Sequence, residues 1–329
     1  MSNQIPVNIS EQLELPVISA PMFLVSSPQM VVEGCKAGIV GTFPLLNART
    51  GEILEQWMGE INEELEKARK EEPNRKIAPW GVNLIIHRSN KRFESDLELV
   101  RKYQPPVVIT SLGNPSEVVK VVHEYGGLVF SDVISTKHAK KAATCGVDGL
   151  ILVCNGAGGH GGTINPVAFI AEVKQFWNGI TILAGCLSSG RDVLAAQVLG
   201  ADFAYMGTRF IATTEAMASE EYKSMLVESD VDDIIYTDAI SGVNANFLAP
   251  SLQKAGFDLA NLQKPDEINV AHADHHENEA KAWKDVWSAG QGVGAVKKVQ
   301  PISEVVRELK EEYQQAVQLV SNNSSTSKV

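Results

Sequence analysis

Hydrophobic and polar residues follow two alternating patterns along the first two thirds of the chain. Short apolar, β-branched segments recur, each followed by Gly, Pro or Ser and then by a stretch with the spacing of an amphipathic helix. This alternation predicts parallel βαβ units. The expected strands lie at residues 16–20, 39–43, 78–86, 107–112, 127–133, 149–154, 181–184 and 203–206. Eight such units predict an α/β fold, a closed (β/α)₈ TIM barrel, over residues 1–213.

The first clear helix illustrates this pattern. Glu and Lys occupy one face, and the opposite face is apolar, as expected for a helix that coats a barrel. The apolar positions are Ile53, Leu54, Trp57, Met58, Ile61, Leu65 and Ala68.

The repeat stops after the eighth strand. Residues 214–290 contain helical segments with little β patterning, which predicts a smaller, mainly helical domain, inserted after strand eight, that binds substrate or acts as a lid. Residues 291–329 predict a helix that returns to the barrel, capped by Ser303, and then a disordered polar tail, SNNSSTSKV. The inward positions expected on this helix are Val305, Val306, Leu309, Tyr313, Ala316 and Leu319 or Val320.

Composition narrows the class of protein. The chain has 329 residues, 44% of them hydrophobic, and a formal net charge of −11. A large core is therefore available, and nucleic acids and anionic membrane surfaces are disfavoured as partners. The sequence shows no signal-peptide pattern and no apolar run long enough to span a membrane, so we expect a cytoplasmic protein acting on a small molecule. A homo-oligomer is among the assemblies that this composition allows.

In a barrel of this type, the active site forms at the carboxyl ends of the strands, and phosphate commonly binds after strands seven and eight. Strand seven runs into Gly185, and strand eight runs into Gly207 and Thr208. Glycine lets backbone N–H groups approach an anion closely, and each segment precedes a helix start. Ordinary turns would also contain these glycines. Because both segments stand at the expected places, we favour a phosphate site formed by Gly185, Gly207 and Thr208.

Strand six leads into an unusual segment, NGAGGHGGT at residues 155–163, where five glycines surround His160. The backbone of Ala157, Gly158 and Gly159 can pack against a flat ligand. Histidine titrates near neutrality, so His160 above the barrel mouth is a candidate general base. The structural alternative is a histidine in a solvated turn. The glycine-rich setting favours the functional interpretation.

The same segment matches G-x-G-x-x-G through Gly156, Gly158 and Gly161. A dinucleotide-binding Rossmann unit requires this turn after its first strand and an acidic residue at the end of the next strand. Here the turn follows strand six, and the next strand ends in Leu183-Ala184-Gly185. The Rossmann interpretation is therefore disfavoured.

Other strand ends offer residues that could border a bound ring system. Each also has a structural alternative: Asn83 could cap a turn, Ser111 could cap the helix near Pro115, and Asp132 could be an N-cap or a loop salt-bridge partner. These residues are Pro21, Met22, Asn83, Ser111 and Asp132.

Two further features invite a chemical interpretation. The cluster at residues 272–276, HADHH, lies among acidic and basic residues and indicates a solvated helix more than a metal site, so no metal is expected. The four cysteines are too few and scattered for a disulfide framework. Cys154 and Cys186 stand near the expected mouth without a paired histidine or basic cluster, which favours bystander thiols over nucleophiles.

At these residues the sequence resembles the nitronate monooxygenase family, formerly called 2-nitropropane dioxygenases. The similarity covers most of the chain in the right order. The matching segments are Ala20-Pro21-Met22, Gly81-Val82-Asn83, the glycine-rich loop ending at His160, Leu183-Ala184-Gly185, Met206-Gly207-Thr208-Arg209-Phe210, and residues 282–292.

The resemblance implies FMN as the cofactor. Pro21, Met22 and Asn83 would border the flavin, and the loop glycines would approach it. The phosphate would bind at the ends of strands seven and eight. The implied reaction oxidises an alkyl nitronate with O₂ to a carbonyl compound and nitrite. In members that accept neutral nitroalkanes, the loop histidine removes the α-proton.

This chain departs from the family pattern at the end of strand five. Relatives tend to carry Lys near the flavin there, whereas this sequence reads Phe130-Ser131-Asp132-Val133. Exchanging a cation for a carboxylate changes the local potential and hence the redox preference of a flavin. The alternative activity is NAD(P)H-dependent reduction of a quinone or an enoyl thioester, as in related barrels. A third hypothesis is a flavin-binding or phosphate-ligand-binding protein without catalysis.

Overall fold

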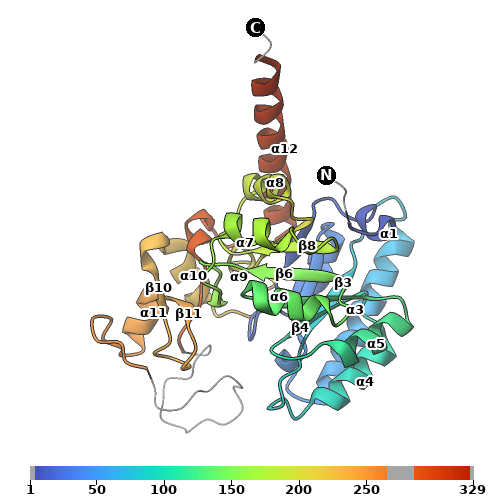
Figure 1. The fold of residues 1–329 in the computed structure, drawn as a ribbon, viewed down its shortest axis with the longest axis horizontal. Helices are drawn as coiled ribbons and strands as arrows, with labels where there is room; N and C mark the ends of the chain where they lie inside the picture. The colour runs from blue at the N-terminus through green and yellow to red at the C-terminus, as the bar shows by residue number, and fades with distance from the viewer. Residues whose placement is uncertain (1–3, 265–284, 327–329) are drawn as a thin grey trace.

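The computed structural model describes residues 4–264 and 285–326, and its centre is a closed barrel of eight parallel strands (Figure 1). Neighbouring strands follow one another in the chain, and β9 pairs with β1 to close the barrel. The barrel strands are β1 (Val17–Ser19), β2 (Val40–Pro44), β3 (Trp80–Ile85), β4 (Val107–Ser111), β5 (Leu128–Val133), β6 (Gly149–Val153), β8 (Ile180–Ala184) and β9 (Phe203–Met206). The predicted fold class is confirmed, and every expected strand matches to within two residues.

Each barrel strand is followed by a helix on the outside of the barrel (Figure 1). These helices are α2 (Pro28–Lys36), α3 (Gly51–Glu71), α4 (Phe93–Tyr103), α5 (Ser116–Glu124), α6 (Thr136–Ala143), α7 (Pro166–Val173), α8 (Gly190–Leu199) and α9 (Thr208–Ile211). A short helix, α1 (Val7–Ser10), precedes the first strand, and a 3₁₀ turn, η1 (Leu45–Asn47), follows β2.

The amphipathic stripe predicted for α3 faces the barrel with one exception. Thr50 caps the helix by accepting a hydrogen bond from the Ile53 N–H at 3.3 Å. Trp57 is partly buried against Phe43. Ile53 was wrongly placed inward and is 37% exposed, because neighbouring helical residues point about 100° apart and Leu54 takes the inward direction. The fully buried positions of the stripe are Leu54, Met58, Ile61 and Leu65.

The interior of the barrel is filled by side chains that alternate along the strands with those packed under the helices. The interior cluster includes residues from the N-terminal segment as well as the strands. Its buried members include Ile9, Ile18, Val40, Ile109, Phe130, Ile151, Ile182 and Phe203. This packing closes the barrel interior, so a ligand can enter only at a strand end.

The segment after strand eight contains strands as well as helices. Its described elements are α10 (Glu220–Glu228), η2 (Val231–Asp233), β10 (Ile234–Thr237), β11 (Ala245–Leu248) and α11 (Ala249–Lys254). β10 and β11 pair antiparallel, and β11 also pairs with β7 (Gly159–His160). The expectation of little β structure was therefore wrong here. Two four-residue strands are too short to show a clear alternation, and β11 also pairs with His160 and Gly159, which lie 85 and 87 residues earlier in the chain.

The chain returns through η3 (Gln291–Ala295) to α12 (Ile302–Thr326). The expected Ser303 cap was wrong, since the helix already begins at Ile302 and the Glu215 carboxylate accepts the Ile302 N–H at 3.0 Å. Gly190 on α8 allows close packing, because a Cβ there would lie 1.9 Å from the Leu309 carbonyl oxygen. The buried positions of α12 include Val305, Val306, Leu309 and Ala316, with Tyr313 partly buried.

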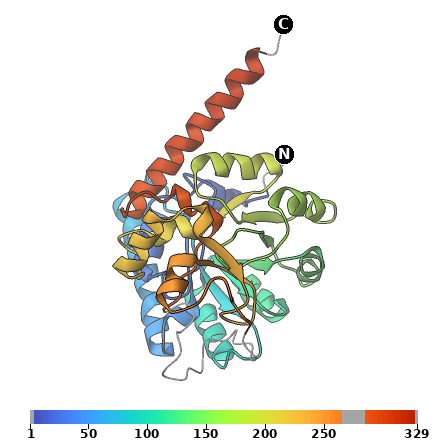
Figure 2. The ribbon, with the colours of Figure 1, turned by 90° about the vertical axis from the view of Figure 1, so that its left-hand side faces the viewer.

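The far end of α12 projects from the body of the protein (Figures 1 and 2). Either Leu319 or Val320 was expected to face inward, but the two side chains are 55% and 57% exposed. This part of the helix extends beyond the barrel. Residues 321–326, expected to be disordered, continue the helix, since extending an established helix costs little. Among the described residues, no helix is both long and apolar enough to cross a membrane.

Candidate active site

A cavity of about 770 Å³ opens at the carboxyl ends of the barrel strands. Its size lies in the range of small-molecule and cofactor pockets. All residues singled out as catalytic or cofactor-binding from the sequence line this one cavity. They are Pro21, Met22, Asn83, Asp132, Ala157, Gly158, Gly159, His160, Gly185, Gly207 and Thr208. The structure thus brings them together, and their individual roles stay predictions.

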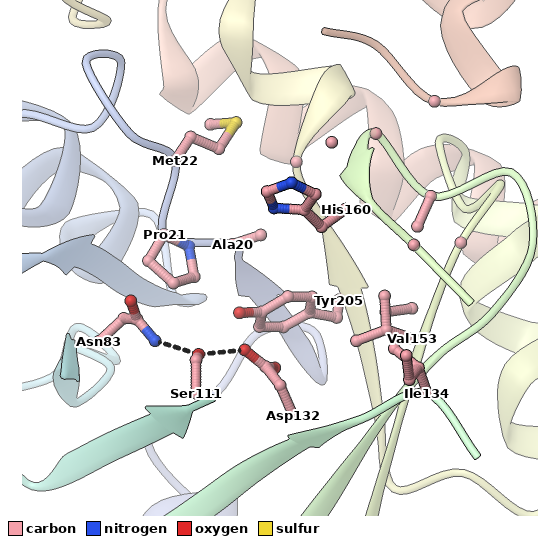
Figure 3. A pocket seen from close by; sticks show the side chains of 18 of the residues that line it. Ala20, Pro21, Met22, Asn83, Ser111, Asp132, Ile134, Val153, His160 and Tyr205 are labelled. Atoms are coloured by element: carbon pink, nitrogen blue, oxygen red, sulfur yellow. Dashed lines mark hydrogen bonds between the residues drawn. The ribbon is translucent and has the colours of Figure 1, made fainter. Parts of the chain in front are cut away.

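Three polar side chains form a hydrogen-bonded chain along one wall of the cavity (Figure 3). The Asn83 Nδ2 atom donates to Ser111 Oγ at 2.7 Å, and Ser111 Oγ donates to Asp132 Oδ2 at 2.6 Å. The residues lie in the carboxyl-terminal halves of β3, β4 and β5, which are neighbours in the barrel. Their side chains therefore take part in this chain of hydrogen bonds, and not in the turn cap expected for Asn83 or the helix caps expected for Ser111 and Asp132.

The other carboxyl oxygen of Asp132 has no such partner. Asp132 Oδ1 is buried and accepts no hydrogen bond from the described residues. Burial raises the pKa of Asp132 to about 6, although the Ser111 hydrogen bond opposes this shift. Asp132 therefore changes protonation much closer to neutrality than an ordinary aspartate.

His160 lies over the cavity on the short strand β7 (Figure 3). Its backbone is paired with Ala245 of β11, so the inserted segment fixes its position. The Ser241 hydroxyl lies 3.2 Å from His160 Nε2 and donates its own proton to the Val243 carbonyl at 3.1 Å. With its proton given to Val243, the Ser241 oxygen is an acceptor for Nε2–H, which corresponds to the tautomer of neutral His160 that is protonated on Nε2. Burial lowers the pKa of His160, which favours this neutral form.

The glycines of the His160 loop serve packing within the protein as well as access to the cavity. A Cβ on Gly158 would lie 2.9 Å from the Gly290 nitrogen, so the two backbones can meet only without side chains. The Gly156 carbonyl accepts a hydrogen bond from the Gln291 N–H at 2.9 Å. Part of the glycine content therefore reflects contact with the returning chain, which the sequence did not reveal.

The two turns expected to bind phosphate differ in how far they are open to an anion. At the start of α8, the N–H groups of Ser188 and Ser189 already donate to the Asp192 carboxylate at 2.9 and 2.8 Å. Gly190 N–H donates to Glu312 at 2.7 Å. These N–H groups at the start of α8 are therefore already paired with carboxylates of the protein, and the role of Gly185 in a phosphate site stays a prediction.

The turn after strand eight is open by comparison. Among the described residues, no side chain caps Gly207 at the start of α9. The Thr208 hydroxyl accepts the Gly290 N–H at 2.9 Å and keeps its own proton to donate. Arg209 is buried and paired with Glu308 at 2.8 Å, so its charge is already compensated. An anion at this turn would thus be held by backbone N–H groups and the Thr208 hydroxyl.

Sequence reasoning missed Tyr205 and Ser241. Tyr205 lines the cavity from β9, and its hydroxyl points toward Ser111 and Asp132 (Figure 3). Burial, with the charge of Asp132 as a second cause, raises the pKa of Tyr205 well above its ordinary value. Alternation along β9 from inward Phe203 could have revealed Tyr205. Ser241 gave no local signal.

Two remaining expectations concern metals and thiols. The HADHH cluster and residues 282–284 lie outside the described residues. Burial raises the pKa of Cys154 to about 12 and also raises the pKa of Cys186. Both thiols are therefore protonated near neutrality, as expected of thiols that are not nucleophiles.

A parallel (β/α)₈ barrel with a cavity at the carboxyl ends of its strands is the architecture of a barrel enzyme. The chain belongs to the nitronate monooxygenase family, whose model matches residues 10–312. It is accordingly a flavin oxidoreductase.

One relative in sequence and two solved structures of similar fold illustrate this resemblance. The chain is 25% identical to a nitronate monooxygenase of Neurospora crassa, over 92% of this chain and 90% of that protein. The fold is similar to nitroalkane oxidase from Streptomyces ansochromogenes, with a TM-score of 0.76 and 20% identity over 94% of this chain and 99% of that one. FabK from Thermotoga maritima has a TM-score of 0.75 and 21% identity, over 97% and 99% of the two chains.

Proposed function

We propose that the protein uses FMN to oxidise alkyl nitronates with O₂, giving a carbonyl compound and nitrite. The observation that carries this proposal is the flavin-sized cavity at the strand ends, over which the neutral imidazole of His160 is held. Neutral nitroalkanes are a second substrate class, because deprotonating their α-carbon requires a base at this place.

The residues of the cavity fit FMN. The turn at Gly207 and Thr208 suits a terminal phosphate, since it offers backbone N–H groups and no competing side-chain cap. Ala157, Gly158 and Gly159 offer a wall without bulky side chains, and Gly185 adds to it. Pro21, Met22, Asn83 and Asp132 would border the ring system, and the buried Asp132 Oδ1 still needs a partner.

FMN would supply the electron acceptor that passes electrons from the nitronate to O₂. The protein's own contribution to a neutral nitroalkane is proton removal by His160 Nδ1. Ser241 fixes the Nε2 proton, and the backbone pairing of β7 with β11 holds the ring over the cavity. Residues 214–290 would act as the substrate domain, since Tyr222, Val243 and Ser288 reach the cavity from this segment.

Ser241→Ala should shift His160 toward the tautomer with its proton on Nδ1. Loss of one neutral hydrogen bond of about 0.5 to 1.5 kcal/mol predicts a roughly two- to tenfold slower flavin reduction by a neutral nitroalkane. Nitrogen-15 NMR of the histidines reports the tautomer directly. Ser241→Thr retains a hydroxyl and should preserve both the tautomer and the rate. An unchanged His160 spectrum in the alanine variant would remove Ser241 from this role.

Anaerobic mixing tests the function itself. We expect released flavin to be FMN by mass spectrometry, and we expect propionate 3-nitronate or an alkyl nitronate to bleach the bound flavin. Admitting O₂ should restore the colour and produce nitrite. Bleaching by NADH but not by nitronates would favour the reductase alternative. A bound flavin that neither substrate reduces would indicate a binding protein without catalysis.

A further inference from the structure

Asp132 combines features that the proposed reaction does not use. Its Oδ2 accepts the Ser111 hydroxyl, while its Oδ1 is buried without a hydrogen-bond donor among the described residues. A buried carboxylate oxygen without a donor is unfavourable. Two conditions remove this cost: a proton on the carboxyl group, or a ligand that donates to it.

Within residues 4–264 and 285–326, no lysine, arginine or histidine forms an ion pair with Asp132. The charged or titratable side chains that line the same cavity are Tyr205 of β9, His160 of β7, His138 and Lys141 of α6, Cys186 after β8, and Tyr222 of α10. Of these, Tyr205 interacts electrostatically with Asp132, and this interaction raises the pKa of Tyr205. His138 and Lys141 are exposed and therefore screened by water.

We propose that Asp132 is a redox-linked proton acceptor of the flavin pocket, taking up one proton when the bound flavin is reduced. This inference rests on the proposed function, because it places FMN in the cavity that Asp132 lines. Two-electron reduction with uptake of one proton leaves a negative charge on the flavin ring system. A carboxylate that lines the same cavity then becomes less favourable, and protonation of Asp132 removes the like-charge repulsion.

The proton balance gives a measurable signature. Two electrons from the reductant enter the flavin, one proton binds to the flavin, and a second proton from solvent binds to Asp132. For a two-electron couple, each proton taken up lowers the midpoint potential by about 30 mV per pH unit, the equivalent of a tenfold change in equilibrium constant. The intact protein should therefore show about 60 mV per pH unit between the pKa values of Asp132 in the oxidised and reduced protein.

The experiment compares midpoint potentials of the FMN-loaded protein over about pH 7 to 8.5 by anaerobic dye-linked titration. Asp132→Asn keeps the shape of the side chain but cannot exchange a proton, so its slope should fall to about 30 mV per pH unit. Asp232→Asn is the matched control, because Asp232 is exposed on η2, and its slope should equal that of the unmodified protein.

A measurement without flavin tests the same group. Carbon-13 NMR of the apoprotein with labelled aspartates, assigned through Asp132→Asn, should show Asp132 titrating near pH 6. Ser111→Ala should move this titration upward, because the hydroxyl stabilises the charged form. An ordinary aspartate titration in the apoprotein would overturn the inference.

If FMN binds and nitronate reduces it, but the slopes of Asp132→Asn and the unmodified protein agree, only this inference fails. If FMN does not bind, the proposed function fails too.

Discussion

Gly207→Asp is expected to weaken FMN binding about a thousandfold while leaving the barrel folded. Gly207 has an ordinary backbone with φ of −101°, and a Cβ there would meet its nearest neighbour, Met22 Sδ, at 3.4 Å. The site therefore accepts a small side chain, and the effect of aspartate comes from its charge beside the proposed phosphate. Two like charges about 4 Å apart repel by about 4 kcal/mol at an effective dielectric constant near 20. This corresponds to a roughly thousandfold larger dissociation constant, that is, weaker binding of FMN.

Fluorescence titration of the apoprotein with FMN measures this loss. Gly207→Ala separates bulk from charge and should bind FMN within about tenfold of the unmodified protein, since its methyl group makes only ordinary contacts. Circular dichroism and the thermal midpoint of the apoprotein should be nearly unchanged in both variants. Full flavin occupancy in Gly207→Asp would place the phosphate elsewhere.

Gly185 is a less decisive position for the same test. Its φ is +113°, a conformation that side chains rarely adopt, and a Cβ would lie 3.0 Å from the Asn155 carbonyl oxygen. Gly185→Asp should also lose flavin, but backbone strain contributes to that loss alongside charge. The structure therefore makes Gly207 the better site for isolating the electrostatic effect.

The barrel was predictable because its signals are local. Strand β9, residues 203–206, is a continuous apolar run, and α3 has its stripe at helical spacing, so each element can be recognised without its neighbours. The exceptions depend on distant partners. β11 pairs with β7 of a distant loop as well as with β10, and the Ile302 N–H at the start of α12 donates to Glu215.

The candidate site shows the same difference between local signals, which could be predicted, and contacts with distant residues, which could not. The topology of a parallel barrel places all strand ends at one mouth, so His160, Asn83 and Asp132 could be grouped from sequence alone. Their partners could not all be predicted. Ser241 stands 81 positions after His160, and the Glu312 carboxylate that occupies the α8 start comes from the last helix. The role of Asp192 could have been predicted from the sequence, since Ser189 and Asp192 have the spacing of a capping box.

His160→Ala is expected to lose about 10²- to 10⁴-fold in flavin reduction by a neutral nitroalkane, the usual contribution of a positioned general base. The unmodified protein must accept such a substrate for the comparison. Burial lowers the pKa of His160, so the imidazole is neutral at neutral pH and the base form is lost only as pH falls through this lowered pKa. The reduction rate of the unmodified protein should therefore fall toward acid pH, and the alanine variant should lack the contribution of this group.

Comparing a neutral nitroalkane with its pre-formed nitronate separates proton removal from other roles of His160. A nitronate supplied already deprotonated bypasses the base, so its rate should fall distinctly less in His160→Ala than the rate with the neutral nitroalkane. Stopped-flow bleaching of both proteins at matched FMN occupancy measures the two losses. An equal loss with both substrates would assign His160 to binding or charge stabilisation. An unchanged rate with the neutral nitroalkane would show that another group removes the proton. Asp132, which titrates closer to neutrality than an ordinary aspartate and lines the same cavity, would then be the next residue to replace.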